Sequence, residues 1–180
     1  YLAGYPYSTA DGYASRILTV ASLRDVLDQF RSSGFAGAAA ANATIAADVA
    51  ALVALQNDDG GFAYFRRGKP SDPYVSLQAT HALLAARGAG VEVPGDAVGR
   101  ALSYAADIEH HMDPAWDQTV RDTLSAYALH VRALGGVRDT VKAQALWTGR
   151  GDQLGLEAAA WLWPEIDDPA IDAAIERRIT

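Results

Sequence analysis

Two adjacent histidines near the middle of the chain are the best candidates for metal ligands. His110 and His111 follow Asp107 and precede Asp113, and imidazole and carboxylate groups both bind metals. Adjacent residues on a helix point about 100° apart, so only one of the two histidines can share a face with Asp107. Two ligands are fewer than a tight site uses. We therefore expect a solvated helix end with no metal and no other cofactor.

An acidic run near the C-terminus, Glu165-Ile166-Asp167-Asp168, resembles the acid motif of triterpene cyclases. In that chemistry a buried carboxylic acid protonates an alkene. Pro169 follows directly, and proline suits the first turn of a helix, so the sequence favours Asp168 as a helix cap. Four other carboxylates could supply the acid pair of a glycosidase, although the sequence does not give their separation: Asp72, Glu109, Asp113 and Asp117.

The composition excludes several classes of protein. The chain has 180 residues, no cysteine and a net charge of −7, so disulfides, thiolate metal sites and cysteine nucleophiles are absent. Its 15 Lys and Arg residues are spread along the sequence, whereas nucleic-acid binding needs clustered cations. Polar residues or glycine interrupt every long apolar run. We expect no nucleic-acid partner and no direct insertion into a membrane.

Apolar residues recur every three to four positions along most of the chain, which predicts an all-α protein. Capping residues, proline and glycine set the expected ends; Gly34 ends the first helix, Ser71 or Asp72 caps the third, and Asp113 caps the fifth. The predicted helices cover about 15–32, 43–56, 73–88, 95–108, 115–134, 138–147, 153–163 and 169–179. With no evident linker, residues 1–180 are expected to form a single domain.

A weak internal repeat relates residues 82–91 to residues 128–137. Each copy ends a predicted helix and leads through glycine into the next one. The spacing of the copies fits stacked antiparallel helical hairpins, whose apolar faces are buried only against neighbouring hairpins. We expect an α/α toroid of such hairpins that is incomplete.

The segment Tyr5-Pro6-Tyr7-Ser8-Thr9-Ala10-Asp11-Gly12-Tyr13-Ala14-Ser15-Arg16 resembles the thioester segment of bacterial alpha-2-macroglobulin-like proteins. In that family the pattern is Tyr-Pro-Tyr-Gly-Cys-x-Glu-Gln, then two residues, then Ser-Arg. The flanks agree, but the centre does not. Ser8 stands for Gly, Thr9 for Cys, Asp11 for Glu and Gly12 for Gln. A turn into the first helix, with Asp11 as its cap, is the simpler interpretation of the segment.

A second segment, Gln56-Asn57-Asp58-Asp59-Gly60-Gly61-Phe62, resembles a turn motif of helical toroids, including thioester domains. The resemblance implies that Gln56 binds a neighbouring helix terminus. From the residues alone, Asp59, Gly60 and Gly61 predict a turn, since the segment lacks the ligand pattern of a calcium loop. Phe62, Tyr64 and Phe65 are expected to pack in the core or between helices.

The resemblance implies a non-catalytic domain of a large periplasmic or secreted protein. Members of this family entrap proteases, and a chain with neither the thiol nor the glutamine would contribute to trapping without a covalent bond. The implied partners are neighbouring domains of the same chain and proteases that the parent protein inhibits. Two alternatives remain open: a toroid enzyme acting on a carbohydrate or isoprenoid, and a structural interaction scaffold.

Overall fold

The computed structural model describes residues 9–30, 37–166 and 168–179. Most of these residues are helical, which confirms the all-α class, and their only β feature is an isolated antiparallel bridge between Gln56 and Phe62. The chain divides into two compact units, residues 1–104 and 105–180. The single domain over 1–180 and its closure into part of a toroid remain predictions. Gly34 and Ser8 lie outside the described residues.

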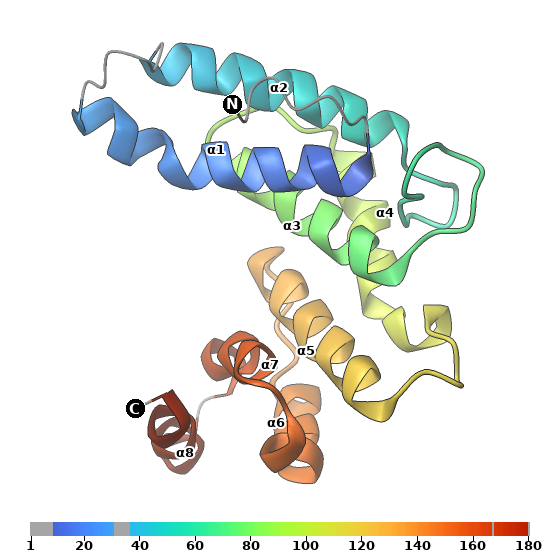
Figure 1. The fold of residues 1–180 in the computed structure, drawn as a ribbon, viewed down its shortest axis with the longest axis vertical. Coiled ribbons are helices and arrows are strands. Elements are labelled where there is room, and N and C mark those ends of the chain that lie inside the picture. The colour runs from blue at the N-terminus through green and yellow to red at the C-terminus, as the bar shows by residue number, and fades with distance from the viewer. Residues whose placement is uncertain (1–8, 31–36, 167, 180) are drawn as a thin grey trace. The chain divides into compact units, whose positions relative to one another are not determined.

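The first unit is built on a pair of antiparallel helices, α1 (Ala10–Phe30) and α2 (Gly37–Ala54), which lie side by side (Figure 1). Helix α1 also packs against α3 (Pro73–Gly88), and α4 (Gly95–Ala106) follows. Ile17, Leu52, Phe62 and Leu83 are completely buried in the shared core. The α2–α3 loop, residues 55–72, lies beside the beginning of α1 (Figure 1).

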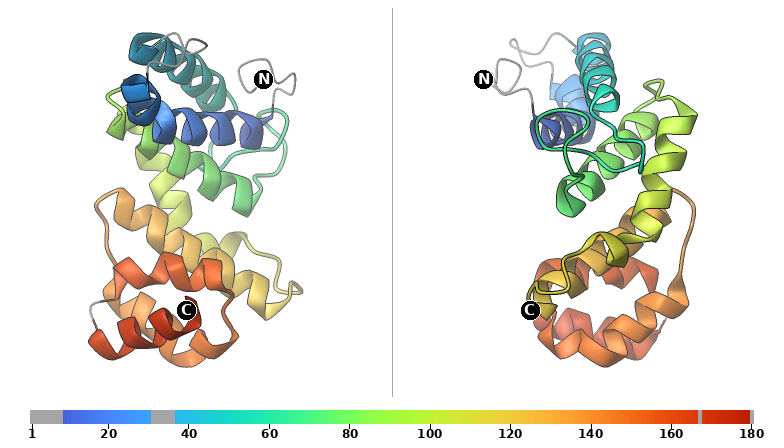
Figure 2. Two further views of the ribbon diagram at one scale, coloured as in Figure 1. Left: turned by 60° about the vertical axis from the view of Figure 1, so that its left-hand side comes forward. Right: turned by 90° about the vertical axis from the view of Figure 1, so that its right-hand side faces the viewer.

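The second unit contains α5 (Gln118–Leu134), α6 (Thr140–Arg150), α7 (Leu156–Leu162) and α8 (Pro169–Ile179). Short 3₁₀ segments η2 (Ile108–His111), η3 (Gly151–Gln153) and η4 (Trp163–Glu165) connect or precede them. Helix α5 packs against α7 (Figure 2), and α8 packs against α7 and η4. Leu162 and Ile175 are completely buried in this core.

Several predicted helix ends were wrong: α2 starts six residues before its predicted position, and capping explains the later start of α5. Helix α5 starts at Gln118 because Asp117 accepts a hydrogen bond from the backbone of Thr119, whereas Asp113 stabilises only a turn through Ala115. Helix α1 starts five residues earlier than predicted. By contrast, Asp72 caps α3 through the backbone N–H of Val75, as expected.

The internal repeat corresponds to two helix ends with the same geometry. Gly90 after α3 and Gly136 after α5 both adopt a positive φ, 78° and 87°. In both copies the following valine N–H donates to a carbonyl five residues earlier, at 3.0 Å for Val91 and 2.9 Å for Val137. This glycine-terminated cap is the physical basis of the repeat.

Candidate functional site

Thr9 forms the N-terminal cap of α1. Its Oγ1 accepts a hydrogen bond of 3.3 Å from the backbone N–H of Gly12, and its carbonyl accepts one of 3.0 Å from Tyr13. The residue is buried, with 8% of its surface exposed. The Thr9 hydroxyl therefore stabilises the helix start, and the predicted cap, Asp11, was wrong because Asp11 lies inside the first turn.

Asp11 instead joins α1 to the α2–α3 loop. Its Oδ2 accepts a hydrogen bond of 3.1 Å from the hydroxyl of Tyr64. One residue earlier, the backbone N–H of Ala10 donates to the carbonyl of Tyr64 at 2.9 Å. These two bonds hold the start of α1 against the loop that carries the second sequence motif.

Gln56 is the polar centre of that loop. It is 2% exposed, and its Nε2 donates to the carbonyls of Gly60 at 3.0 Å and Ala97 at 2.9 Å. Its Oε1 accepts a hydrogen bond of 2.7 Å from Arg100. Ala97 lies in the first turn of α4, so the expected bond between Gln56 and a neighbouring helix terminus is present.

The turn residues Asp59, Gly60, Gly61 and Phe62 have structural roles. Asp59 accepts hydrogen bonds from the N–H of Gly61 and the hydroxyl of Ser71, both at 2.9 Å. Gly60 has φ +88°, and a Cβ there would lie 2.3 Å from the carbonyl oxygen of Arg100. Phe62 is completely buried, but Phe65 is 69% exposed. Packing in the core or between helices was therefore the right prediction for Phe62 and the wrong one for Phe65.

Two residues at the end of the first motif, Ser15 and Arg16, connect helices. Arg16 forms a two-point ion pair with Asp48 of α2, at 2.6 Å from Nε and 2.5 Å from Nη2. The Ser15 hydroxyl accepts a hydrogen bond of 3.0 Å from Gln78 of α3. Sequence reasoning missed Asp48. The available signal was that Asp48 is the one charged residue of the Gly37–Ala54 helix.

Two side chains of the first unit, Arg16 and Tyr104, have raised pKa values. Hydrogen bonding to Asp48 raises the pKa of Arg16 above its ordinary value, against the opposing effect of burial. Burial raises the pKa of the Tyr104 hydroxyl to about 12, although a hydrogen bond with Ser76 acts in the other direction. Both groups therefore keep their protons at neutral pH.

The metal and acid candidates lie in the second unit and are used structurally. His110 pairs with Asp107, and its side chain is 81% exposed, as expected of a solvated helix end. Asp168 accepts a hydrogen bond of 2.9 Å from Ala170, which confirms it as the cap of α8. Glu165 is buried and lies 3.5 Å from His130 Nδ1 and 3.4 Å from Arg138 Nε.

The carboxylates considered for a glycosidase pair also have structural partners. Asp72 and Asp117 cap helices, and Asp113 closes a turn. Glu109 forms an ion pair of 2.7 Å with Lys142 and accepts a hydrogen bond of 2.9 Å from Ser125. Burial opposes ionisation of Glu109, but these hydrogen bonds outweigh it and lower its pKa.

Within residues 9–30, 37–166 and 168–179, no three or more His, Asp or Glu side chains are placed to hold a metal ion. In the same residues, no helix combines the length and the apolar character that crossing a bilayer requires.

Comparison with solved structures identifies the fold. Native Escherichia coli alpha-2-macroglobulin, from its MG7 domain to the C-terminus, matches 98% of this chain with a TM-score of 0.81 and 18% identity. The chain has the fold of a helical segment of bacterial alpha-2-macroglobulins. The cryo-EM structure of the native Escherichia coli protein matches 99% of the chain with a TM-score of 0.79 and 20% identity.

Salmonella alpha-2-macroglobulin reacted with methylamine matches 98% of the chain, with a TM-score of 0.80 and 19% identity. The chain spans 29% of the shorter Escherichia coli alpha-2-macroglobulin structure and 12% of each of the other two. No family model matches the chain, and no curated protein matches it significantly in sequence. The likeness that these comparisons find is therefore one of helix arrangement.

The chemistry available at the start of α1 follows from its side chains. Joining two side chains as a thioester requires a thiol and an acyl group, but Thr9 supplies a hydroxyl and Gly12 supplies no side chain. The nearest carboxylate, Asp11, is hydrogen-bonded to Tyr64. This arrangement stabilises the junction between α1 and the loop and contains no pair of groups that could form a thioester.

Proposed function

We propose that this chain is a non-catalytic domain of an alpha-2-macroglobulin-like protein and contributes to protease trapping without a thioester. Thr9 and Gly12 would occupy the positions of the thioester cysteine and glutamine. The observation that carries the proposal is the capping bond from Gly12 N–H to Thr9 Oγ1 within an alpha-2-macroglobulin fold. The domain would act through its shape and its contacts with neighbouring domains.

Structures of activated relatives support proteases as targets of the parent protein. Trypsin-activated Escherichia coli alpha-2-macroglobulin matches 96% of this chain with a TM-score of 0.71 and 21% identity, and the elastase-activated form has a TM-score of 0.70. The native form, from its MG7 domain to the C-terminus, has a TM-score of 0.81. By analogy, we infer that the parent protein is periplasmic or secreted, where it would meet foreign proteases.

A trapping assay on the full-length parent protein tests this function. After incubation with trypsin, cleavage of a small chromogenic peptide should continue, while cleavage of a large protein such as casein should fall sharply. Denaturing electrophoresis should then release the protease, since no acyl group is available at residue 12. Equal inhibition towards both substrates, or none towards either, would overturn trapping; protease that remains attached after denaturation would overturn its non-covalent character.

A further inference from the structure

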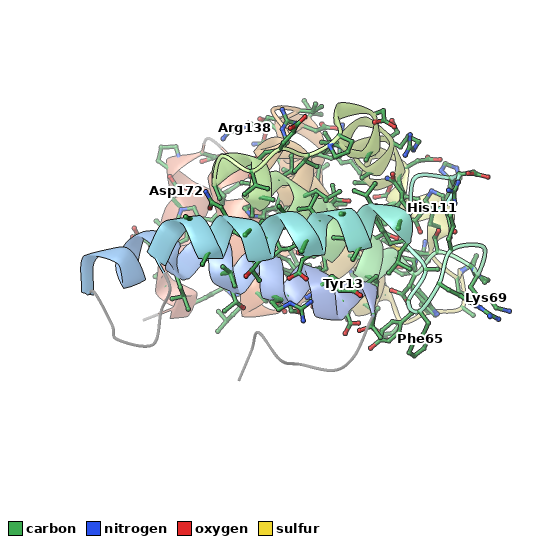
Figure 3. The ribbon with its side chains drawn as sticks, turned by 90° about the horizontal axis from the view of Figure 1, so that it is seen from above. Tyr13, Phe65, Lys69, His111, Arg138 and Asp172 are labelled. Carbon is green, nitrogen blue, oxygen red and sulfur yellow. The ribbon has the colours of Figure 1, made fainter. Side chains whose placement is uncertain are left out.

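The α2–α3 loop presents aromatic and cationic side chains to solvent. We call Tyr64, Phe65, Arg66, Arg67 and Lys69 the basic aromatic tip; all five are exposed. The rings of Tyr64 and Phe65 lie 4.6 Å apart at an interplanar angle of 59°, and Phe65 is 69% exposed. Figure 3 shows Phe65 and Lys69 on the outer side of the loop, pointing away from α1 and α2.

The backbone of the tip is fixed by residues that are not part of it. Asn57 donates through Nδ2 to the carbonyl of Lys69 at 2.8 Å and to the hydroxyl of Ser71 at 2.9 Å. Its Oδ1 accepts from the N–H of Gly68 at 2.8 Å. The carbonyl of Tyr64 is held by Ala10. The exposed side chains are therefore displayed on a pre-organised loop, which lowers the entropy cost of binding.

The charge of the tip opposes that of the chain as a whole. Residues 65–69 contain three cations and no acid, whereas the chain has a net charge of −7. Arg67 pairs with Asp58, but Arg66 and Lys69 form no ion pair within the part of the chain that the structure describes. Aromatic and Arg side chains are enriched where protein interfaces gain most of their affinity.

We propose that the basic aromatic tip docks on an acidic protein surface with an apolar pocket that receives Phe65. Only Arg66 and Lys69 of the tip lack an ion-pair partner in the described part of the chain, which is fewer cations than the clusters that bind phosphate-rich partners, and the chain has a net charge of −7. This favours a protein partner over a nucleic acid or an anionic membrane. The proposal concerns one surface of this chain and does not depend on protease trapping.

A binding experiment with a defined probe tests the proposal. Fluorescently labelled random copolymer of glutamate and tyrosine is titrated with the protein, and polyglutamate and a lysine–tyrosine copolymer are titrated in parallel. We expect saturable binding of the glutamate–tyrosine copolymer, weaker binding of polyglutamate and no binding of the lysine–tyrosine copolymer. Phe65→Ala should weaken binding about tenfold, because it removes the aromatic anchor.

Two double variants with the same change in net charge distinguish binding by the tip from attraction by overall charge. Arg66→Glu with Lys69→Glu should weaken binding of the glutamate–tyrosine copolymer at least tenfold. Arg87→Glu with Arg177→Glu changes the net charge equally at other exposed positions and should leave binding within about twofold. Equal losses in both variants, binding unaffected by the tip variants, or tighter tip-dependent binding to phosphatidylserine vesicles or single-stranded RNA would overturn the proposal.

Discussion

The guanidinium of Arg16 on α1 and the carboxylate of Asp48 on α2 form two hydrogen bonds, at 2.6 and 2.5 Å. The Arg16 side chain is 13% exposed and the Asp48 side chain 8%. The Arg16 guanidinium also lies over the ring of Tyr13, 5.4 Å from its centroid; Tyr13 is labelled in Figure 3. This ion pair joins the motif that starts α1 to the middle of α2, so it fixes how the first two helices pack.

Removing one partner of this ion pair should be strongly destabilising. Asp48→Ala leaves the Arg16 charge buried without its counter-ion, and we expect a loss of about 3 kcal/mol in the free energy of unfolding. The double variant Arg16→Met, Asp48→Leu replaces the pair with apolar groups and should recover most of that loss. Urea denaturation measures both. An Asp48→Ala variant as stable as the parent would show that the pair does not hold α1 to α2.

Two glycines of the α2–α3 loop provide a matched test of its packing. Gly60 and Gly68 have almost equal positive φ angles, 88° and 85°, but only at Gly60 would a Cβ meet another part of the chain. Gly68→Ala should cost about 1 kcal/mol for the backbone conformation alone, and Gly60→Ala about 3 kcal/mol because α4 must also move. Thermal unfolding compares the two. Equal costs would contradict the close approach of this turn to α4.

The ion pair of Glu109 predicts a dependence of stability on pH. The folded-state pKa of Glu109 is lowered from its ordinary value of 4.5. Its contribution is therefore fully present above that value and is lost as the pH falls through the folded-state pKa. The difference in Tm between the parent and Glu109→Gln should be largest at pH 7 and should shrink towards pH 3. A difference that stays constant over this range would be inconsistent with an ionised Glu109 paired with Lys142.

The sequence predicted local features better than long-range ones. Helix α8 has the predicted bounds, Pro169–Ile179, because Asp168 and Pro169 act on adjacent backbone groups. The prediction of Asp113 as the cap of α5 was wrong, since Asp117 is the same residue type four positions later and only the path of the chain decides which of them caps the helix. The pairing of Arg16 with Asp48 spans 32 positions, and nothing in the sequence near Arg16 specifies it.

In the candidate site, too, the long-range contacts were harder to predict than the local turns. The bond from Gln56 to the beginning of α4 was expected only through the resemblance, because residues 56 and 97 are 41 positions apart. Phe65 was expected to pack in the core or between helices, yet its side chain is exposed on a loop whose backbone Asn57 binds at Gly68 and Lys69. Residue type alone did not reveal this exposed surface.

Mass spectrometry of the peptide that contains Thr9 is the most direct test of a domain that acts without a thioester. The full-length protein would be incubated with trypsin or with isotopically labelled methylamine, denatured and digested. We predict that this peptide keeps its unmodified mass under both conditions, because Thr9 caps α1 and residue 12 has no acyl group. A crosslink within the segment, or a covalent adduct at Thr9, would contradict the account.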